Sequence, residues 1–136
     1  MKGRAVANET TRDLEDLVVL TLPASSAYLS VLRTVTAGLA ARLDFTLDEI
    51  EDLRIAVDEA CAMLLANAAP EAELTCRFQL ESGRIRVDVT SETTRLPARD
   101  TFAWTVLSAL VGEVDATRDD AGYISICLIK RKGEMV

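Results

Sequence analysis

The sequence predicts an α+β domain, a two-layer sandwich whose antiparallel mixed sheet carries helices on one face. Two sequence patterns indicate this fold class. Short stretches alternate apolar and polar residues, as strands do, and longer stretches repeat apolar residues every three or four positions, as amphipathic helices do. Hydrophobic residues make up 49% of the 136-residue chain, enough for one core. The predicted order is β-α-α-β-β-α-β-β, because each amphipathic element must bury one side.

The first half contains a strand and two helices. Residues 17–22 form a β-branched run that Pro23 stops, and a helix follows over 24–43. Ser25 or Ser26 can cap this helix. Its predicted core side consists of Tyr28, Leu32, Val35, Leu39 and Leu43.

The second helix begins with a capping box. Thr46 and Glu49 have the Thr-x-x-Glu spacing in which the two side chains accept hydrogen bonds from backbone N–H groups at a helix start. The helix should end before Pro70, since the residue preceding a proline disfavours helix. Its predicted core side is Ile50, Leu53, Val57, Cys61 and Leu64.

The second half predicts a hairpin, a helix and two further strands. The expected elements are strands over 74–80 and 84–89 around Ser82-Gly83, a polar loop over 91–99, a helix over 102–111, and strands over 113–118 and 123–131. Phe102 and Trp104 are expected in the core, and the basic run 130–132 at the frayed surface. We expect a flexible leader over 1–15, one domain over 16–132 and a tail over 133–136.

Composition narrows the function. The chain has no histidine, which excludes Ser-His-Asp and Cys-His catalysis and histidine metal sites. A net charge of −7 disfavours direct nucleic-acid binding, although it also simply aids solubility. The three cysteines lie in apolar runs and are expected as buried free thiols. With no signal peptide and no membrane-length apolar run, the expected location is the cytoplasm.

Three motifs in order resemble one family. They are the stretch Leu53-Arg54-Ile55-Ala56-Val57-Asp58-Glu59-Ala60-Cys61, the stretch from Ala103 to Val114, and the helix end Ala41-Arg42-Leu43-Asp44. Together they resemble the anti-sigma factor and serine kinase group of RsbW and SpoIIAB, within the GHKL ATPases. Pro70 and the Phe102-Ala103-Trp104 opening resemble a divergent mycobacterial-type branch. The resemblance implies the GHKL (Bergerat) fold.

The resemblance also implies a degenerate nucleotide site. Glu59 takes the position of the family's general base, and Met63 stands where an asparagine holds Mg²⁺. A thioether cannot replace that hard oxygen ligand. The family's Asp-x-Gly-x-Gly corresponds to a stretch that includes Ser91, Thr93 and Arg95, and its glycine-rich lid to residues 96–100. Glu59 is therefore expected to be vestigial, with no metal and no cofactor, although ATP and Mg²⁺ are implied by the family.

The same resemblance assigns a partner surface to the first helix. The family's partner-binding arginine corresponds to Arg33, and Leu29, Arg33, Thr36 and Ala40 are expected to form an exposed stripe. The implied function is a homodimeric anti-sigma factor that sequesters a stress- or sporulation-type sigma factor. A STAS-domain anti-anti-sigma factor would release it, without ATP. Two alternatives stay open: an active serine kinase acting on that antagonist, and an adaptor that binds another regulator or a small ligand.

Overall fold

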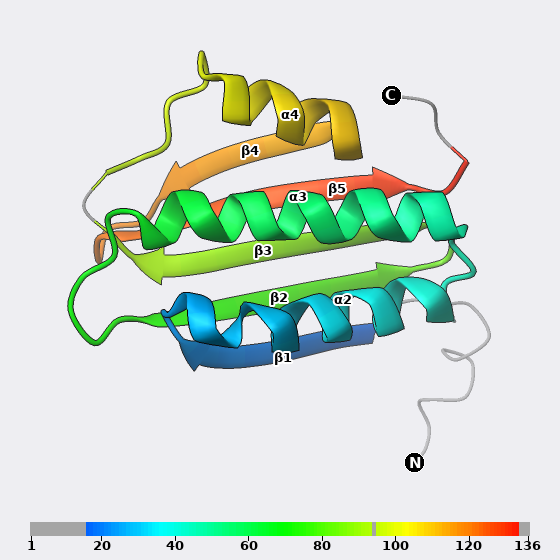
Figure 1. The fold of residues 1–136 in the computed structure, drawn as a ribbon, viewed down its shortest axis with the longest axis horizontal. Helices are drawn as coiled ribbons and strands as arrows, with labels where there is room; N and C mark the ends of the chain where they lie inside the picture. Colours follow the sequence, from blue (N-terminus) through cyan, green and yellow to red (C-terminus); the bar gives the residue numbers. More distant parts are fainter. Residues whose placement is uncertain (1–15, 94, 134–136) are drawn as a thin grey trace.

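The structure, a computed structural model, describes residues 16–93 and 95–133. Its elements follow the predicted order, and a short 3₁₀ helix precedes the first α-helix (Figure 1). The strands are β1 (Asp16–Pro23), β2 (Glu73–Glu81), β3 (Arg84–Glu92), β4 (Glu113–Arg118) and β5 (Tyr123–Arg131). The helices are η2 (Ser26–Tyr28), α2 (Leu29–Arg42), α3 (Leu47–Leu65) and α4 (Phe102–Val111). The expected leader over 1–15, and the tail beyond Gly133, lie outside the described residues.

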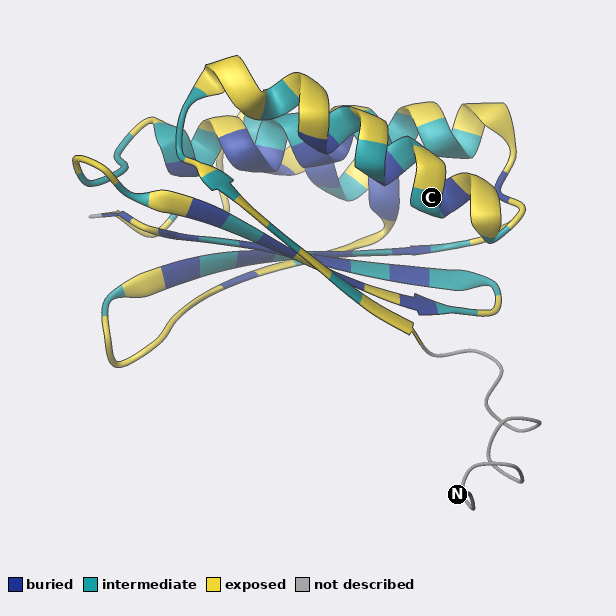
Figure 2. Ribbon diagram, turned by 90° about the horizontal axis from the view of Figure 1, so that it is seen from below, coloured by how far each residue is buried: buried dark blue, intermediate teal, exposed yellow. Residues whose placement is uncertain are grey.

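The described strands form one sheet in the order β1-β2-β3-β5-β4. The α+β class is confirmed, but the expectation of a mixed sheet is wrong, because every neighbouring pair of described strands is antiparallel. The β2–β3 turn contains Gly83 at a φ of 77°, a left-handed conformation that favours glycine. Figure 2 shows the helices on one face of the sheet, and no described helix covers its other face.

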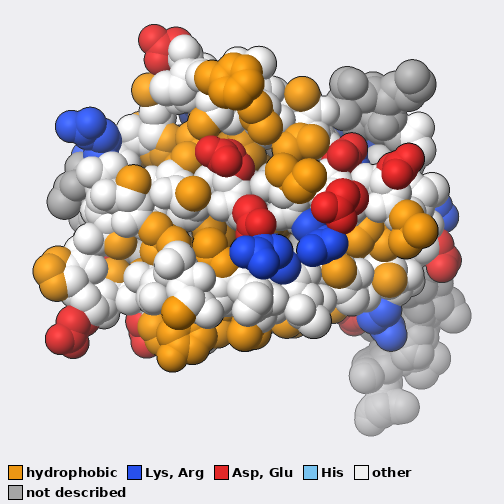
Figure 3. Space-filling view, viewed as in Figure 1, with side chains coloured by type: hydrophobic (Ala, Val, Ile, Leu, Met, Phe, Trp, Pro, Cys, Tyr) orange, Lys and Arg blue, Asp and Glu red, His pale blue; other side chains and the backbone are white. Residues whose placement is uncertain are grey.

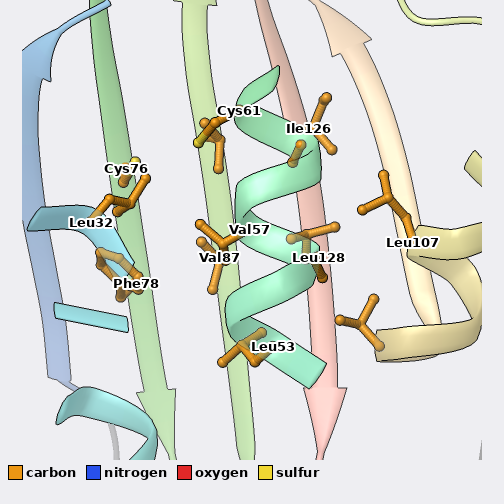
Figure 4. Close-up of a cluster of buried hydrophobic side chains, with 14 of the residues drawn as sticks. Leu32, Leu53, Val57, Cys61, Cys76, Phe78, Val87, Leu107, Ile126 and Leu128 are labelled. Atoms are coloured by element: carbon orange, nitrogen blue, oxygen red, sulfur yellow. The ribbon is translucent and has the colours of Figure 1, made fainter. Parts of the chain in front are cut away.

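The core lies between the sheet and the helices. Every second residue of β2 and β3 is buried, as the alternating pattern predicts. Phe78 of β2 is fully buried and is among the largest side chains of the core. Figure 4 shows how side chains from α2, α3, α4 and the sheet meet there, with Leu32, Val57 and Leu107 among the labelled residues.

Helix α3 confirms the predicted capping box. The Thr46 hydroxyl accepts a hydrogen bond from the Glu49 backbone N–H at 3.2 Å, and the Glu49 carboxylate accepts one from the Thr46 N–H at 2.8 Å. The bond from the Thr46 backbone holds the pKa of Glu49 below its usual value. The predicted core side is also confirmed, with Ile50 partly buried and four residues fully buried: Leu53, Val57, Cys61 and Leu64.

Helix α2 turns a different side to the core than its apolar pattern predicts. Leu32 is buried as expected, but Thr36 and Ala40 are also fully buried, and Tyr28 is 42% exposed. Small side chains allow α2 to lie close to its neighbours, and the Thr36 hydroxyl donates to the Leu32 carbonyl at 2.8 Å, so its burial leaves no polar group unsatisfied. The flanks of this side are partly buried: Leu29, Val35, Leu39 and Leu43.

Helix α4 places one of its two predicted core aromatics in solvent. Trp104 is buried, but Phe102 is 82% exposed, so its expected burial is wrong. The Thr101 hydroxyl accepts a hydrogen bond from the Trp104 N–H at 3.2 Å and so fixes where the helix starts. With Trp104 facing inward, a residue two positions earlier lies about 200° around the helix, on the outer side.

Lys130 is a buried cap rather than a frayed surface residue. Its side chain is 3% exposed, and its ammonium donates a hydrogen bond to the Leu110 carbonyl at 2.8 Å, in the last turn of α4. A cation there is favoured by the partial negative charge at the end of a helix. Strand β5 thereby fixes the end of α4 against the sheet.

All three cysteines are free thiols, but only two are fully buried. Cys61 of α3 interacts with Cys76 of β2, and this contact together with burial raises the pKa of Cys61. Cys127 is half-buried, which corrects the expectation that all three are buried. Burial and the nearby Asp88 carboxylate raise the pKa of Cys127 to about 12.

These environments predict how the thiols react with Ellman's reagent. At pH 8 we expect one thiol, Cys127, to react slowly, because little of it is ionised. Cys61 and Cys76 should react only after a denaturant unfolds the chain. Cys127→Ser is the control and should leave no thiol that reacts in the folded protein. Fast reaction of two or more thiols without denaturant would contradict this placement.

Candidate partner surface and nucleotide-site positions

Glu59 and Met63 lie one turn apart on α3, so both face the same side of the helix. Both are half-buried. The Glu59 carboxylate accepts no hydrogen bond from any residue of the described ranges, while the Met63 side chain packs against the core. The position that the resemblance links to a metal ligand is therefore filled by an apolar side chain.

A hollow of about 300 Å³ opens beside Met63, between the end of α3 and the start of α4. Most of its lining is apolar, and Arg95 is the one charged residue among the described residues that line it. The structure therefore brings Met63 and Arg95 to one hollow. The lining consists of Met63, Asn67, Arg95, Leu96, Pro97, Ala98, Thr101 and Ala103.

Ser91 and Thr93 use their hydroxyls to hold the backbone. Ser91 is fully buried and donates to the Glu73 carbonyl at 2.8 Å. Thr93 donates to the Asn67 carbonyl at 2.7 Å and so ties the chain after β3 to the end of α3. Both residues are buried, so neither hydroxyl is accessible to a base at the surface of this fold. These two positions do not contribute to the hollow.

Arg99 fixes the loop between β3 and α4 in place. Its guanidinium donates to the Asp115 carboxylate at 2.5 Å and to the Ala116 carbonyl at 3.1 Å, and it lies 4.9 Å from the centre of the Trp104 ring. The hydrogen bond from Arg99 lowers the pKa of Asp115. A loop anchored to β4 and α4 and free of glycine does not form the backbone cradle that phosphates need.

The described residues therefore do not fit Mg²⁺ and a nucleotide. Met63 offers a thioether where a hard oxygen is required, and the hollow beside it presents mainly carbon. Across residues 16–93 and 95–133, no three His, Cys, Asp or Glu side chains gather as they would around a metal ion.

The expected exposed stripe on α2 is partly wrong. Thr36 and Ala40 are fully buried, so neither can contact a partner on the surface of this fold. Leu29 is half-buried and packs against the core. Of the four predicted residues, Arg33 presents the most accessible polar group, with 39% of its side chain exposed.

Arg33 forms an ion pair that joins α2 to α3. Its Nε donates to both carboxylate oxygens of Asp58, at 2.9 and 2.7 Å. The Asp58 side chain is 35% exposed, so the pair lies at the boundary between the core and solvent. A charge-assisted contact of this kind restricts the guanidinium to one orientation on the helical face.

The sequence pattern did not indicate the outer side of α2 as a candidate surface. Ser30, Thr34 and Gly38 are exposed there, and Arg54 of α3 lines one hollow together with Ser30 and Thr34. One signal was available, because a glycine inside a helix costs about 1 kcal/mol relative to alanine. At Gly38 an added Cβ would meet nothing within 4 Å, so the fold itself gives no reason for the glycine.

Comparison with known proteins identifies relatives by sequence. No family model matches the chain. The serine-protein kinase RsbW of Bacillus subtilis (strain 168) is 38% identical over 80 residues, which cover 57% of this chain and 50% of that protein. RsbW of Bacillus mycoides (strain KBAB4) is 29% identical over 103 residues, covering 74% of this chain and 61% of the relative.

A solved structure shares the fold. The crystal structure of the RsbU and RsbW domains of Rv1364c from Mycobacterium tuberculosis matches with a TM-score of 0.69 at 18% identity, covering 89% of this chain and 34% of that chain. By sequence, this chain is similar to RsbW proteins. The RsbW-like chain spans about half the length of the curated relatives it matches. None of its described helices is long and apolar enough to cross a membrane.

Proposed function

We propose that this RsbW-like chain is an anti-sigma factor. It sequesters an alternative sigma factor of the stress or sporulation type in the bacterial cytoplasm, and a STAS-domain anti-anti-sigma factor competes for the same surface. The chain acts as a homodimer and without ATP. Sequence similarity to RsbW proteins supports the class of function, and the misfit of the nucleotide-site positions supports binding rather than catalysis.

The observation that carries the proposal is the placement of Arg33. It lies on α2, the helix that the resemblance links to partner binding, and Asp58 holds its guanidinium at the surface. Arginine suits such a surface because its planar group makes several hydrogen bonds at once and its hydration is weaker than that of lysine.

Co-purification tests the proposal directly. The full chain would be mixed with each alternative sigma factor of its source organism and with the housekeeping sigma factor as a control. We expect a stable complex with at least one alternative sigma factor, and its release by a STAS-domain protein. Absence of a complex with every sigma factor would overturn the proposal.

A serine kinase is the second candidate, because the relatives carry that name and Glu59 is present. Calorimetric titration with ATP and Mg²⁺ separates the two. We expect no saturable heat up to millimolar nucleotide, since the thioether of Met63 cannot hold the metal. Micromolar binding would favour the kinase. An RsbW with its family asparagine intact serves as the positive control.

The apolar hollow beside Met63 favours a third candidate, an adaptor that binds a small ligand. A hollow of about 300 Å³ is at the lower limit for small-molecule sites. A ligand bound at Met63 and Ala103, with no sigma factor complex, would favour this function over the anti-sigma factor.

Gly38→Ala tests whether a partner covers the outer side of α2. We expect the free energy of unfolding to rise by about 0.5–1 kcal/mol, because alanine favours helix and an added Cβ meets no atom. The same methyl group should weaken the complex with the sigma factor by keeping the partner at a greater distance. Urea unfolding and calorimetric titration measure the two effects. Unchanged affinity in the stabilised variant would place the interface elsewhere.

A further inference from the structure

A hollow of about 300 Å³ lies between α2 and α3, on the helical face of the molecule. Its described lining is Ser30, Arg33, Thr34 and Ala37 of α2 together with Arg54 of α3. Figure 3 shows basic side chains near the middle of this face, with acidic side chains beside them. Two guanidinium groups thus share one hollow in a chain whose net charge is −7.

Both guanidinium groups have N–H donors that their ion pairs do not use. Arg33 bonds to Asp58 through Nε alone, and Arg54 bonds to Glu51 through one Nη at 2.8 Å. Within the described ranges, their other N–H groups donate to no residue. Side-chain exposures of 39% for Arg33 and 36% for Arg54 leave these groups accessible. Such donors match the oxygens of a carboxylate in number and geometry.

Asp58 contributes to the hollow indirectly. Its two short contacts to Arg33 Nε orient the guanidinium while leaving the terminal nitrogens for another acceptor. A group that is already oriented loses less conformational entropy when a partner binds. Asp58 is therefore a positioning residue for Arg33.

The side of α2 beside the hollow is built from small residues. Ser30, Thr34 and Ala37 line the hollow, and Gly38 next to them has open space around it. Small side chains let the backbone of another helix approach closely. A phosphate backbone carries a charge at every nucleotide, and the acidic surroundings and the net charge of −7 disfavour it, whereas a single carboxylate needs only the two guanidinium groups.

We propose that this hollow is a carboxylate-binding site for an acidic side chain on a helix of the partner protein. The carboxylate bridges Arg33 and Arg54, and Asp58 holds Arg33 in position. The inference rests on the proposed function and deepens it, because it assigns the chemistry of the partner and adds Arg54 and Asp58 to the surface.

The decisive variant is Arg54→Gln, measured with the sigma factor that co-purifies with the full chain. The ion pair of Arg54 with Glu51 is exposed and spans three residues of one helix, so its loss should leave folding unchanged. We expect affinity to fall about tenfold or more, the effect of losing charge-assisted hydrogen bonds. Arg42→Gln removes the same charge from α2 outside the hollow and should change affinity less than about threefold. Equal effects of the two variants would overturn the proposal.

Asp58→Asn tests whether Asp58 orients Arg33 for the partner or competes with the partner's carboxylate for Arg33. If Asp58 positions Arg33, the variant should dissociate several-fold faster and bind more weakly, although the surface becomes more positive. Asp58→Glu should restore part of the affinity. Tighter binding of Asp58→Asn would mean that Asp58 competes with the partner and would overturn its positioning role.

A titration with a 20-residue poly-L-glutamate peptide tests the site without a sigma factor. We expect the Nε–H NMR signals of Arg33 and Arg54 to shift together and saturate, and the signal of Arg42 to shift less. A DNA duplex of equal charge should give no saturable shift. A uniform shift of all three arginines, or saturation by DNA alone, would overturn the site, whereas failure of every sigma factor to bind would overturn the proposed function instead.

Discussion

Arg33→Glu is expected to weaken the complex with the sigma factor by roughly 100-fold or more. Removing one member of a hydrogen-bonded charge pair at an interface costs about 2–5 kcal/mol, and the new carboxylate would also repel an acidic partner. The loss should appear mainly as faster dissociation, because guanidinium contacts hold the formed complex together. Surface plasmon resonance with immobilised sigma factor measures both rates.

The fold should survive this change. Arg33 and Asp58 are each more than a third exposed, so their ion pair contributes at most about 1 kcal/mol to stability. Arg42→Glu is the matched control, since it makes the same charge change on an exposed residue of α2. Circular dichroism should show both variants folded. An Arg33→Glu variant that binds as well as Arg42→Glu would remove Arg33 from the interface.

Phe78→Ala is expected to lower the free energy of unfolding by about 3–5 kcal/mol. The Phe78 ring is fully buried on β2 within the cluster of Figure 4, and truncation leaves a cavity that the surrounding sheet and helices cannot fill completely. This loss is a large part of the 5–15 kcal/mol that stabilises a typical domain. Urea unfolding followed by circular dichroism gives the value.

Two further variants serve as controls for Phe78→Ala. Phe78→Leu keeps most of the buried carbon and should cost clearly less than alanine. Val19→Ala changes a residue of β1 that is 48% exposed and should shift stability by less than about 1 kcal/mol. A loss below 1 kcal/mol for Phe78→Ala would mean that the ring does not occupy the core.

Much of the fold could be predicted because its patterns are local. The capping box of Thr46 and Glu49 and the hairpin around Gly83 depend on residues within one turn of chain. The alternation along β2 and β3 likewise needs no distant partner to be recognised. These signals predicted both the type and the order of the elements.

Which side of α2 and of α4 faces the core could not be predicted in the same way. A helix with apolar residues around most of its circumference can turn several sides inward, and the neighbouring elements decide which one is buried. Packing of α2 against the rest of the fold buries Thr36 and Ala40, whose small side chains allow close approach. At α4, the cap at Thr101 set the rotation that leaves Phe102 in solvent.

For the candidate site, the sequence indicated which residue types stand at the nucleotide-site positions but not which contacts they make. Met63 and Arg95 do meet at one hollow, but the hydroxyls of Ser91 and Thr93 bond to the backbone instead. The pairing of Arg33 with Asp58 joins two helices, and no spacing along the sequence reports such a contact.

The position of β1 at the edge of the sheet has a consequence for assembly of the fold. Its only described neighbour is β2, which follows in the chain after both α2 and α3. Closing that long loop costs entropy, which nearby contacts such as the β2–β3 hairpin avoid. We therefore expect the β2–β3 hairpin to form early and β1, which lies beneath α2, to join the sheet later.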